Sequence, residues 1–301
     1  MPSLTYVASF QAITACGAKP VACDVHDANG LMDLQSASKY LSRKTKALMF
    51  VHYASRFDHQ ENVFDFCQSH RIRLIEDAAH SFGCRNQSRK LGCYGDVTCF
   101  SFDGIKNITS GEGGAIFSSD ESVLKRAADL RLLGVEKDSE QRFAGKRSWT
   151  FDVKEQGWRY HMSNVMAAIG RSQLRKLDPI LAPARKKISA LYRNFLGEHP
   201  QVRLFGTPPL EHDLVPHIFP IRVAATHRNS LRDFLKEKGI ETGIHYYPNH
   251  LLTYFKTPYA LPVTEKIFAE VLTLPLHPRL TEDDGMKIIQ EINAYFKKVH
   301  E

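Results

Sequence analysis

The stretches RIRLIEDAA (71–79) and VTCFSFDGIKNITSGEGG (97–114) each place a charged side chain directly after a strand-like run. Their apolar parts are short and rich in β-branched and aromatic residues, which is typical of buried strands. Asp77 ends the first run, and Lys106 follows the second within a turn. Taken alone, such an aspartate is an ordinary helix cap and such a lysine an ordinary solvated charge. The rest of the chain decides between these readings and a functional one.

Strand-like runs alternate with helical patterns around these two stretches. The further expected strands are KPVACDV (19–25), KALMFVHY (46–53) and GAIFSS (114–119). ENVFDFCQSH (61–70) has the apolar spacing of a helix. The alternation predicts an α/β domain with a mostly parallel, doubly wound sheet. Because ligands of such sheets bind beyond the carboxyl ends of the strands, we expect Asp77 and Lys106 to lie close together.

The second half of the chain is mainly helical and then changes character near Pro200. The expected helices are residues 121–133, 163–176, 182–196, 228–238 and 281–298, and the expected strands are residues 202–205, 217–223 and 239–247. We therefore predict a large ligand-binding domain over residues 1–178 and a smaller α/β domain over residues 179–301.

Composition excludes several classes of protein. The 301 residues carry 40 basic and 33 acidic side chains, and the basic ones are spread along the chain. A nucleic-acid-binding protein would concentrate them in a stripe or a known module. The six cysteines show neither a zinc spacing nor a CxxC pair, and no apolar stretch is long enough to span a bilayer. The start lacks the features of a signal peptide, so we expect a cytoplasmic protein with neither nucleic acid nor membrane as partner.

Asp77 and Lys106 together suggest a specific chemistry. A carboxylate can keep a heterocyclic nitrogen protonated, and a lysine amine can form an imine with an aldehyde. These are the two groups that a pyridoxal phosphate enzyme requires. His245 and His250 lack a third ligand at a usual spacing, so substrate-edge or structural roles are expected for them and no metal site is.

Several segments, taken in order, resemble the DegT/DnrJ/EryC1/StrS family of sugar aminotransferases. They are PSLTYVASFQAITACGAKPV (2–21), EDAAHSFG (76–83), FSFDGIKNITSGEGG (100–114), GWRYHMSNVMAAIGRSQLRKL (157–177), GIHYYPNH (243–250) and LPLHPRLT (274–281). The resemblance covers essentially the whole chain. It implies the fold type I of pyridoxal phosphate transferases, with the cofactor at a homodimer interface.

The resemblance also implies roles for single residues. Lys106 would bind the cofactor aldehyde and carry protons, and Asp77 would pair with the pyridine nitrogen. The other implied cofactor contacts are Tyr6 stacking on the ring, His80 near the ring hydroxyl, Ser101 on the phosphate and Arg159 on the phosphate of the neighbouring subunit. Each of these residues also has a simpler interpretation. Tyr6 could be a core residue, Ser101 an ordinary strand serine and GEGG a simple turn.

The chain departs from the family pattern in three places. Arg159 stands where the family commonly has asparagine. Ala54 and Ser55 stand in a stretch that normally contains glycine. Family members also precede PSLTY with a segment whose helix start cradles the cofactor phosphate. Only Met1 precedes PSLTY here, so we expect weaker phosphate binding and an open sheet edge or exposed apolar surface.

The resemblance implies transfer of an amino group, typically from glutamate, to a keto group of a nucleotide-linked deoxysugar. Such reactions serve cell-surface polysaccharide or secondary-metabolite synthesis. The alternative is a truncated or degenerate non-catalytic homologue. Related sugar dehydratases replace the lysine with histidine, so Lys106 argues against that activity, and a branch that aminates aromatic rings stays open. A nicotinamide dehydrogenase is disfavoured because no GxGxxG follows an early strand.

Overall fold

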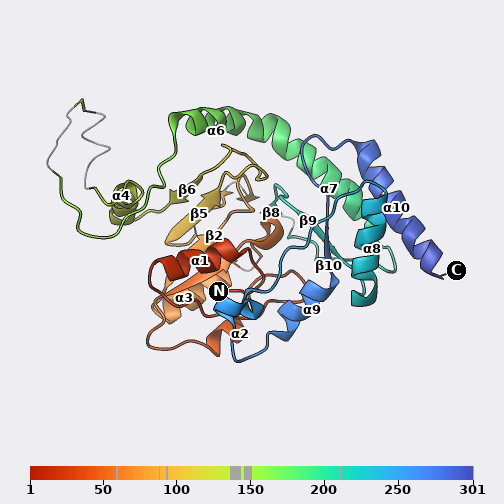
Figure 1. Ribbon diagram of the computed structural model, residues 1–301, viewed down its shortest axis with the longest axis horizontal. Helices are drawn as coiled ribbons and strands as arrows, with labels where there is room; N and C mark the ends of the chain where they lie inside the picture. Colours follow the sequence, from red (N-terminus) through yellow and green to blue (C-terminus); the bar gives the residue numbers. More distant parts are fainter. Residues whose placement is uncertain are drawn as a thin grey trace.

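A four-stranded sheet forms the centre of the N-terminal half (Figure 1). The computed structural model describes residues 1–58, 60–87, 89–92, 94–135, 144–145, 151–209 and 212–300. The strands, in sheet order, are β1 (Ala47–Val51), β2 (Arg73–Asp77), β5 (Val97–Ser101) and β6 (Gly114–Phe117). The first three are parallel, and β6 runs antiparallel to β5. This confirms the predicted α/β fold with a mostly parallel sheet.

Helices of the N-terminal half pack on this sheet or flank it. They are α1 (Val7–Ala15), α2 (Leu34–Ser38), α3 (Gln60–Ser69) and α4 (Glu121–Leu130), with a one-turn helix over Tyr53–Ser55. Val63 and Cys67 of α3 pack against Phe50 of β1 and Leu74 of β2 in one buried cluster. The apolar spacing of residues 61–70 therefore reflects packing on the sheet, as predicted.

A helical arm links the two halves of the chain. It comprises α6 (Asn164–Lys176), a π-helical turn (Leu177–Leu181) and α7 (Ala182–Leu196). Ser163 caps its start by accepting a hydrogen bond from the Met166 N–H at 3.3 Å. In Figure 1 the arm runs from above the sheet to the C-terminal elements. The boundary predicted at residues 178 and 179 falls within this arm, and the two-domain division stays a prediction.

The C-terminal part is built on a small antiparallel sheet of β7 (Arg203–Leu204), β9 (Phe219–Arg222) and β10 (Val271–Leu274). Its helices are α8 (Ala225–Glu237), α9 (Pro262–Glu270) and α10 (Glu282–His300), with one-turn helices over Asn249–Leu251 and Thr253–Phe255. Buried residues of α7, α8, α10, β9 and β10 form a single hydrophobic cluster. A third sheet, of β3 (Arg85–Asn86), β4 (Arg89–Lys90) and β8 (His212–Asp213), joins the two parts of the chain.

Two predicted strands are wrong. Residues 19–25 make only the single bridges Pro2–Cys23 and Val25–Met32, and residues 239–247 make only the bridge Gly243–Thr273. Proline lacks an N–H for the ladder, and glycine weakens a strand, so neither segment sustains a run of pairs. Residues 271–274 form β10, a strand that was not predicted.

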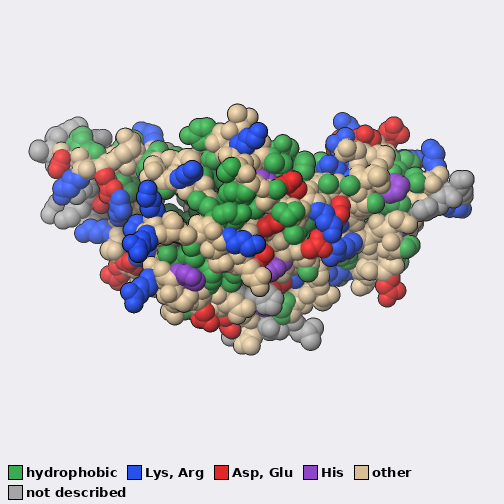
Figure 2. Space-filling model, turned by 90° about the horizontal axis from the view of Figure 1, so that it is seen from below, with side chains coloured by type: hydrophobic (Ala, Val, Ile, Leu, Met, Phe, Trp, Pro, Cys, Tyr) green, Lys and Arg blue, Asp and Glu red, His purple; other side chains and the backbone are tan. Residues whose placement is uncertain are grey.

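β6 is one of the two edge strands of the four-stranded sheet among the described residues. All four residues of β6 are exposed, with half of the Ile116 and Phe117 surfaces accessible. On the face in Figure 2, hydrophobic side chains gather near the middle, and basic and acidic side chains alternate around them. No helix within the described residues is long and apolar enough to cross a membrane.

A buried carboxylate, Glu76, ties β2 to its neighbours and yields a stability prediction. It accepts hydrogen bonds from His52 Nε2 at 2.8 Å, the Gly95 N–H at 2.6 Å and Thr98 Oγ1 at 3.1 Å, and also from the Gln60 side chain. Burial alone raises the pKa of this carboxyl, but His52 and the other donors bring the pKa below its ordinary value. Its contribution to stability is thus present above the pKa of the unfolded state and is lost as the pH falls through the folded pKa.

We expect Glu76→Gln to lower the free energy of unfolding by about 3–5 kcal/mol, because glutamine keeps only one acceptor oxygen and turns an uncharged NH2 group toward buried donors that faced the carboxylate. Urea unfolding at neutral pH measures this change. Glu61→Gln, on the exposed side of α3, is the matched control and should change stability by less than about 0.5 kcal/mol. Equal stabilities of the two variants would show that the Glu76 network contributes nothing net.

Candidate functional site

Asp77 lies at the carboxyl end of β2, and its carboxylate is held from two sides. Ser9 Oγ of α1 donates to Oδ2 at 2.5 Å, and the Ala79 N–H donates to Oδ1 at 3.2 Å. Residues 78–80 form a turn, so the interpretation of Asp77 as a helix cap is wrong. Because the side chain is only partly buried, one flank of the carboxylate stays available to a ligand beyond the strand end.

Lys106 follows β5 in a turn that the backbone closes tightly. Its N–H donates to the Asp103 carbonyl at 3.1 Å, and Asp103 bridges to Gly111. The buried Arg185 guanidinium contacts the carbonyls of Ile105 and Lys106 at 3.5 and 3.4 Å. Within the described part of the chain, the Lys106 amine has neither a hydrogen bond nor an ion pair. The turn therefore presents a half-buried amine without a partner.

Burial lowers the pKa of Lys106, while the charges of Asp77 and Asp103 oppose that shift. The lowered pKa increases the fraction of neutral amine at a given pH, and the neutral amine is the nucleophile. The charge of Asp77 is thus among the influences on the Lys106 amine. Asp77 pairs with Cys99 of β5 in the sheet register, so adjacent parallel strands deliver both groups to one edge, as predicted.

His80 lies behind these groups as a neutral ring. Its Nε2 is 2.7 Å from Tyr246 Oη, and its ring centroid is 4.5 Å from that of His217. Burial holds the pKa of His80 well below its ordinary value, and the nearby His217 and Lys106 lower it further. Burial and then the charge of Asp77 raise the pKa of Tyr246, so its hydroxyl keeps its proton.

Two more histidines surround Lys106. Burial and then the charge of Lys106 hold the pKa of His217 well below its ordinary value and lower that of His245 to about 4. His245 Nδ1 is 2.9 Å from Thr273 Oγ1, which orients its ring. His250, in contrast, is buried between Ser3 Oγ at 2.8 Å and Glu265 at 3.1 Å. Its role is therefore structural, one of the two roles expected for it.

The other three residues predicted to contact the cofactor, Tyr6, Ser101 and Arg159, differ in exposure and in their neighbours. Tyr6 precedes α1, is 61% exposed and has its ring centroid 5.9 Å from that of Tyr246, so it is not a core residue. Ser101 ends β5, where its Oγ accepts from the Asp103 N–H at 3.4 Å. Arg159 is exposed on the excursion between α4 and α6, where it bridges to Leu132. Its predicted contact with the cofactor of a neighbouring subunit stays a prediction.

The GEGG segment is a turn followed by a close backbone contact. A Cβ on Gly114 would lie 2.4 Å from the Phe100 carbonyl oxygen, so only glycine permits β6 to pair with β5 at that point. Gly111 and Gly113 have positive φ angles, which glycine adopts without strain. The interpretation as a turn is confirmed, and the turn brings β6 back along the strand that leads to Lys106.

Sequence reasoning missed the support that Ser55 provides. Ala54 and Ser55 have φ angles of 51° and 67°, so the stretch that departs from the family's glycine nevertheless has a left-handed backbone. Ser55 Oγ donates to the His80 carbonyl at 2.5 Å and accepts from the His217 N–H at 3.0 Å. Ser55 thereby connects the two neighbouring histidines. The sequence offered one indication of this role, because Ser55 lies in a stretch where the family normally has glycine.

The unpaired groups fit pyridoxal phosphate. The Lys106 amine lacks a partner, and His80 Nδ1 is buried without a hydrogen bond within the described residues. The amine suits an aldehyde, the Asp77 carboxylate suits a ring nitrogen, and the Ser101 hydroxyl suits a phosphate oxygen. These are the donors and acceptors that the cofactor requires, on elements that meet at one sheet edge.

The comparisons with known proteins agree with this arrangement. The model of the DegT/DnrJ/EryC1/StrS aminotransferase family matches residues 1–293. GDP-perosamine synthase of Vibrio cholerae is 32% identical over 300 residues, covering 98% of this chain and 79% of the relative. The dTDP-4-dehydro-2,3,6-trideoxy-D-glucose 4-aminotransferase of Saccharopolyspora spinosa is 30% identical over 293 residues, covering 97% and 76%. The solved PLP form of Spr1654 from Streptococcus pneumoniae is 26% identical, with a TM-score of 0.89 and coverage of 99% and 80%.

Proposed function

Since this chain belongs to the DegT/DnrJ/EryC1/StrS aminotransferase family, we propose that it moves the amino group of glutamate to the keto group of a nucleotide-linked deoxysugar. Its cofactor is pyridoxal phosphate. The observation that carries the proposal is the juxtaposition of Asp77 and the unpaired Lys106 amine at the ends of adjacent strands. The names of the two relatives support a nucleotide-sugar substrate. A cytoplasmic location and a role in polysaccharide or secondary-metabolite synthesis stay part of the proposal.

Asp77 acts through its fixed negative charge. Ser9 and the Ala79 N–H hold the carboxylate in place, so its free flank would stabilise a proton on the ring nitrogen of the cofactor. When bound, the cofactor supplies an aldehyde carbon and a cationic ring that withdraws electrons from the amine-bearing carbon. Asp77 contributes by keeping that ring cationic.

Lys106 has two tasks at the site. Its amine would hold the cofactor through the aldehyde carbon, with loss of water, and the lowered pKa favours the neutral amine that this requires. When not bound to the cofactor, the same amine would serve as the base that removes and returns protons at the reacting carbons. His80 stays neutral and hydrogen-bonded to Tyr246, which makes it a positioning group for the ring hydroxyl rather than a competing base. Ser101 would donate to the phosphate.

Product analysis tests the proposed reaction. The protein, loaded with pyridoxal phosphate, is incubated with glutamate labelled at its amino nitrogen and with GDP- and dTDP-linked 4-keto-deoxysugars. Mass spectrometry should find the label in an amino sugar that is still linked to its nucleotide. Label transfer to a free sugar only, or to none of the acceptors while glutamate is converted to 2-oxoglutarate, would contradict the proposed acceptor class.

We further propose that the active form is a homodimer. Support comes from apolar side chains exposed on α6 and the excursion before it. Val165 and Tyr160 are each 72% exposed, Phe151 is 66% exposed, and Ile169 lies one turn after Val165 with 44% of its surface accessible. Large exposed apolar groups along one stretch are typical of an interaction surface. A dimer would also give Arg159 access to the neighbouring site.

Subunit mixing tests that arrangement. Lys106→Ala and Arg159→Ala enzymes are each expected to be weakly active. Mixed dimers contain one site in which the intact lysine and the intact arginine meet, if the arginine acts across the interface. Random mixing should then restore about a quarter of the wild-type activity, because half of the dimers each carry one whole site. No gain on mixing would place Arg159 outside the neighbouring site.

A further inference from the structure

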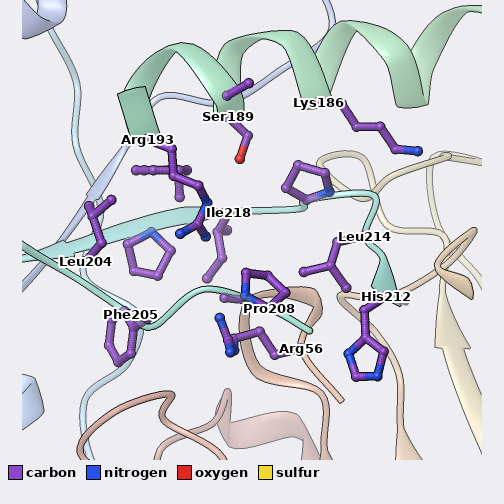
Figure 3. A pocket seen from close by; sticks show the side chains of 15 residues that line it. Arg56, Lys186, Ser189, Arg193, Leu204, Phe205, Pro208, His212, Leu214 and Ile218 are labelled. Carbon is purple, nitrogen blue, oxygen red and sulfur yellow. The ribbon is translucent and has the colours of Figure 1, made fainter. Parts of the chain in front are cut away.

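A cavity of about 230 Å³ opens between α7 and the segment that runs from Leu204 to Pro220 (Figure 3). Its walls are mainly apolar, formed by Leu204, Phe205, Leu214, Ile218, Phe219 and three prolines. Asp77, Lys106 and the cofactor contacts named above do not line it. The cavity is therefore separate from the cofactor site.

One face of α7 supplies the polar side of the cavity. Lys186, Ser189 and Arg193 are spaced by three and four residues, which places them on the same side of the helix. Figure 3 shows Ser189 and Arg193 pointing from the helix toward the middle of the cavity, with Arg56 on the opposite side. Arg193 is half-buried, and among the described residues its guanidinium finds no hydrogen-bond acceptor. Its central carbon lies 5.9 Å from the centre of the Phe219 ring.

One positive charge beside the cavity, that of Arg193, has no carboxylate partner among the described residues. Arg56 pairs with Asp58, and Lys186 pairs with Asp213. Arg193 has no such carboxylate, and the described lining residues include no acidic side chain. Burial lowers the pKa of Arg193, and repulsion by Arg56 lowers it further. An anion between the two guanidinium groups would offset the repulsion between them.

We propose that this cavity binds a small monoanion with an apolar body, of the class of aromatic or branched aliphatic carboxylates. A single unpaired guanidinium matches one carboxylate, whose two oxygens accept two parallel N–H bonds. The apolar walls match a hydrocarbon body. A purely inorganic anion would bury no apolar surface against them and would gain little binding free energy there. The volume is below the roughly 300–1,000 Å³ of drug-sized pockets, which limits the ligand to a small metabolite.

The cavity lies next to the segments around Ser55 and His217, which support the cofactor site. Ala54 and Arg56 line it on either side of Ser55 along the chain, and Pro216 lines it next to His217. Ser55 in turn holds the His80 carbonyl and the His217 N–H. A carboxylate in the cavity would thus rest on the far side of a shared wall without touching the reacting groups.

Calorimetric titration with phenylacetate tests the proposal on the enzyme loaded with pyridoxal phosphate. We expect one saturable site, and binding at least about tenfold weaker in Arg193→Gln, because a charge-assisted pair is lost. Lys187→Gln is the matched control, since Lys187 lies on the exposed side of α7 and pairs with Glu282 at 2.9 Å. It should bind phenylacetate within about twofold of wild type. Arg193→Lys, which keeps the charge, should lie between the two.

Further titrations separate the alternatives. Ser189→Leu keeps Arg193 but fills the cavity, so it should abolish binding, and circular dichroism establishes that each variant is folded. Phenylacetamide, which lacks the charge, should bind much more weakly than phenylacetate. Saturable binding that is unchanged in Arg193→Gln, or no binding to folded wild type, would overturn the proposal. Tighter binding of inorganic phosphate than of phenylacetate would overturn the assignment to carboxylates.

Discussion

Lys106→Ala is expected to abolish the lysine-dependent visible absorption that pyridoxal phosphate acquires in the wild-type protein. The variant loses the covalent bond to the cofactor because no other described amine takes the place of this side chain. It also loses the group that moves protons between carbons, which by itself contributes roughly 10²–10⁴-fold to kcat. Absorption spectra with added cofactor and the glutamate half-reaction measure the two losses separately.

Lys125→Ala is the matched control, because Lys125 is exposed on α4. Its spectrum and its half-reaction should equal those of wild type. An added primary amine should restore part of the lost rate in Lys106→Ala, since the missing group is a base. A wild-type-like spectrum in Lys106→Ala would instead mean that another amine holds the cofactor, and the assignment of Lys106 would be wrong.

Asp77→Asn is expected to give the second largest effect. The substitution keeps the size of the side chain and an oxygen for Ser9, but it removes the charge that keeps the ring nitrogen protonated. A charge-assisted hydrogen bond contributes about 1.5–3 kcal/mol, so cofactor affinity should fall roughly 10–150-fold. The kcat should fall as well, because the uncharged ring withdraws electrons less strongly. Equilibrium dialysis of the cofactor and the half-reaction measure these losses.

The same variant has a pH signature that a merely structural change would not produce. The charge of Asp77 raises the pKa of Lys106, so its removal lowers that pKa and makes the amine neutral at a lower pH. The rate at which the apoenzyme captures the cofactor should therefore reach its plateau at a lower pH in Asp77→Asn. Ser9→Ala, which removes a hydrogen bond to Asp77 without removing the charge, should leave that pH unchanged. If both variants showed the same dependence of capture rate on pH as wild type, the charge of Asp77 would have no effect on the pKa of Lys106.

Local pattern was sufficient to predict most of the fold and to propose Asp77 and Lys106 as the central site residues. Short runs rich in β-branched and aromatic residues located β1, β2, β5 and β6, and helical spacing of apolar residues located the long helices. Asp77 and Lys106 followed from the rule that ligands meet the carboxyl ends of parallel strands. The same reasoning placed strands at residues 19–25 and 239–247, where proline and glycine reduce pairing to single bridges.

The sequence by itself determined the family, the α/β class and the cofactor, and it predicted that Asp77 and Lys106 lie at the same edge of the sheet. These conclusions depend on ordered motifs and on the alternation of elements, which can be recognised without coordinates. Only the tertiary structure decided which distant side chains surround that pair. Tyr246, His217 and Ser55 come from three segments with no shared local pattern. They meet in the folded chain, where Tyr246 and Ser55 both bond to His80 and Ser55 also bonds to the His217 N–H. The unpaired charge of Arg193 is likewise invisible in the sequence, since a missing partner is a property of three-dimensional neighbours.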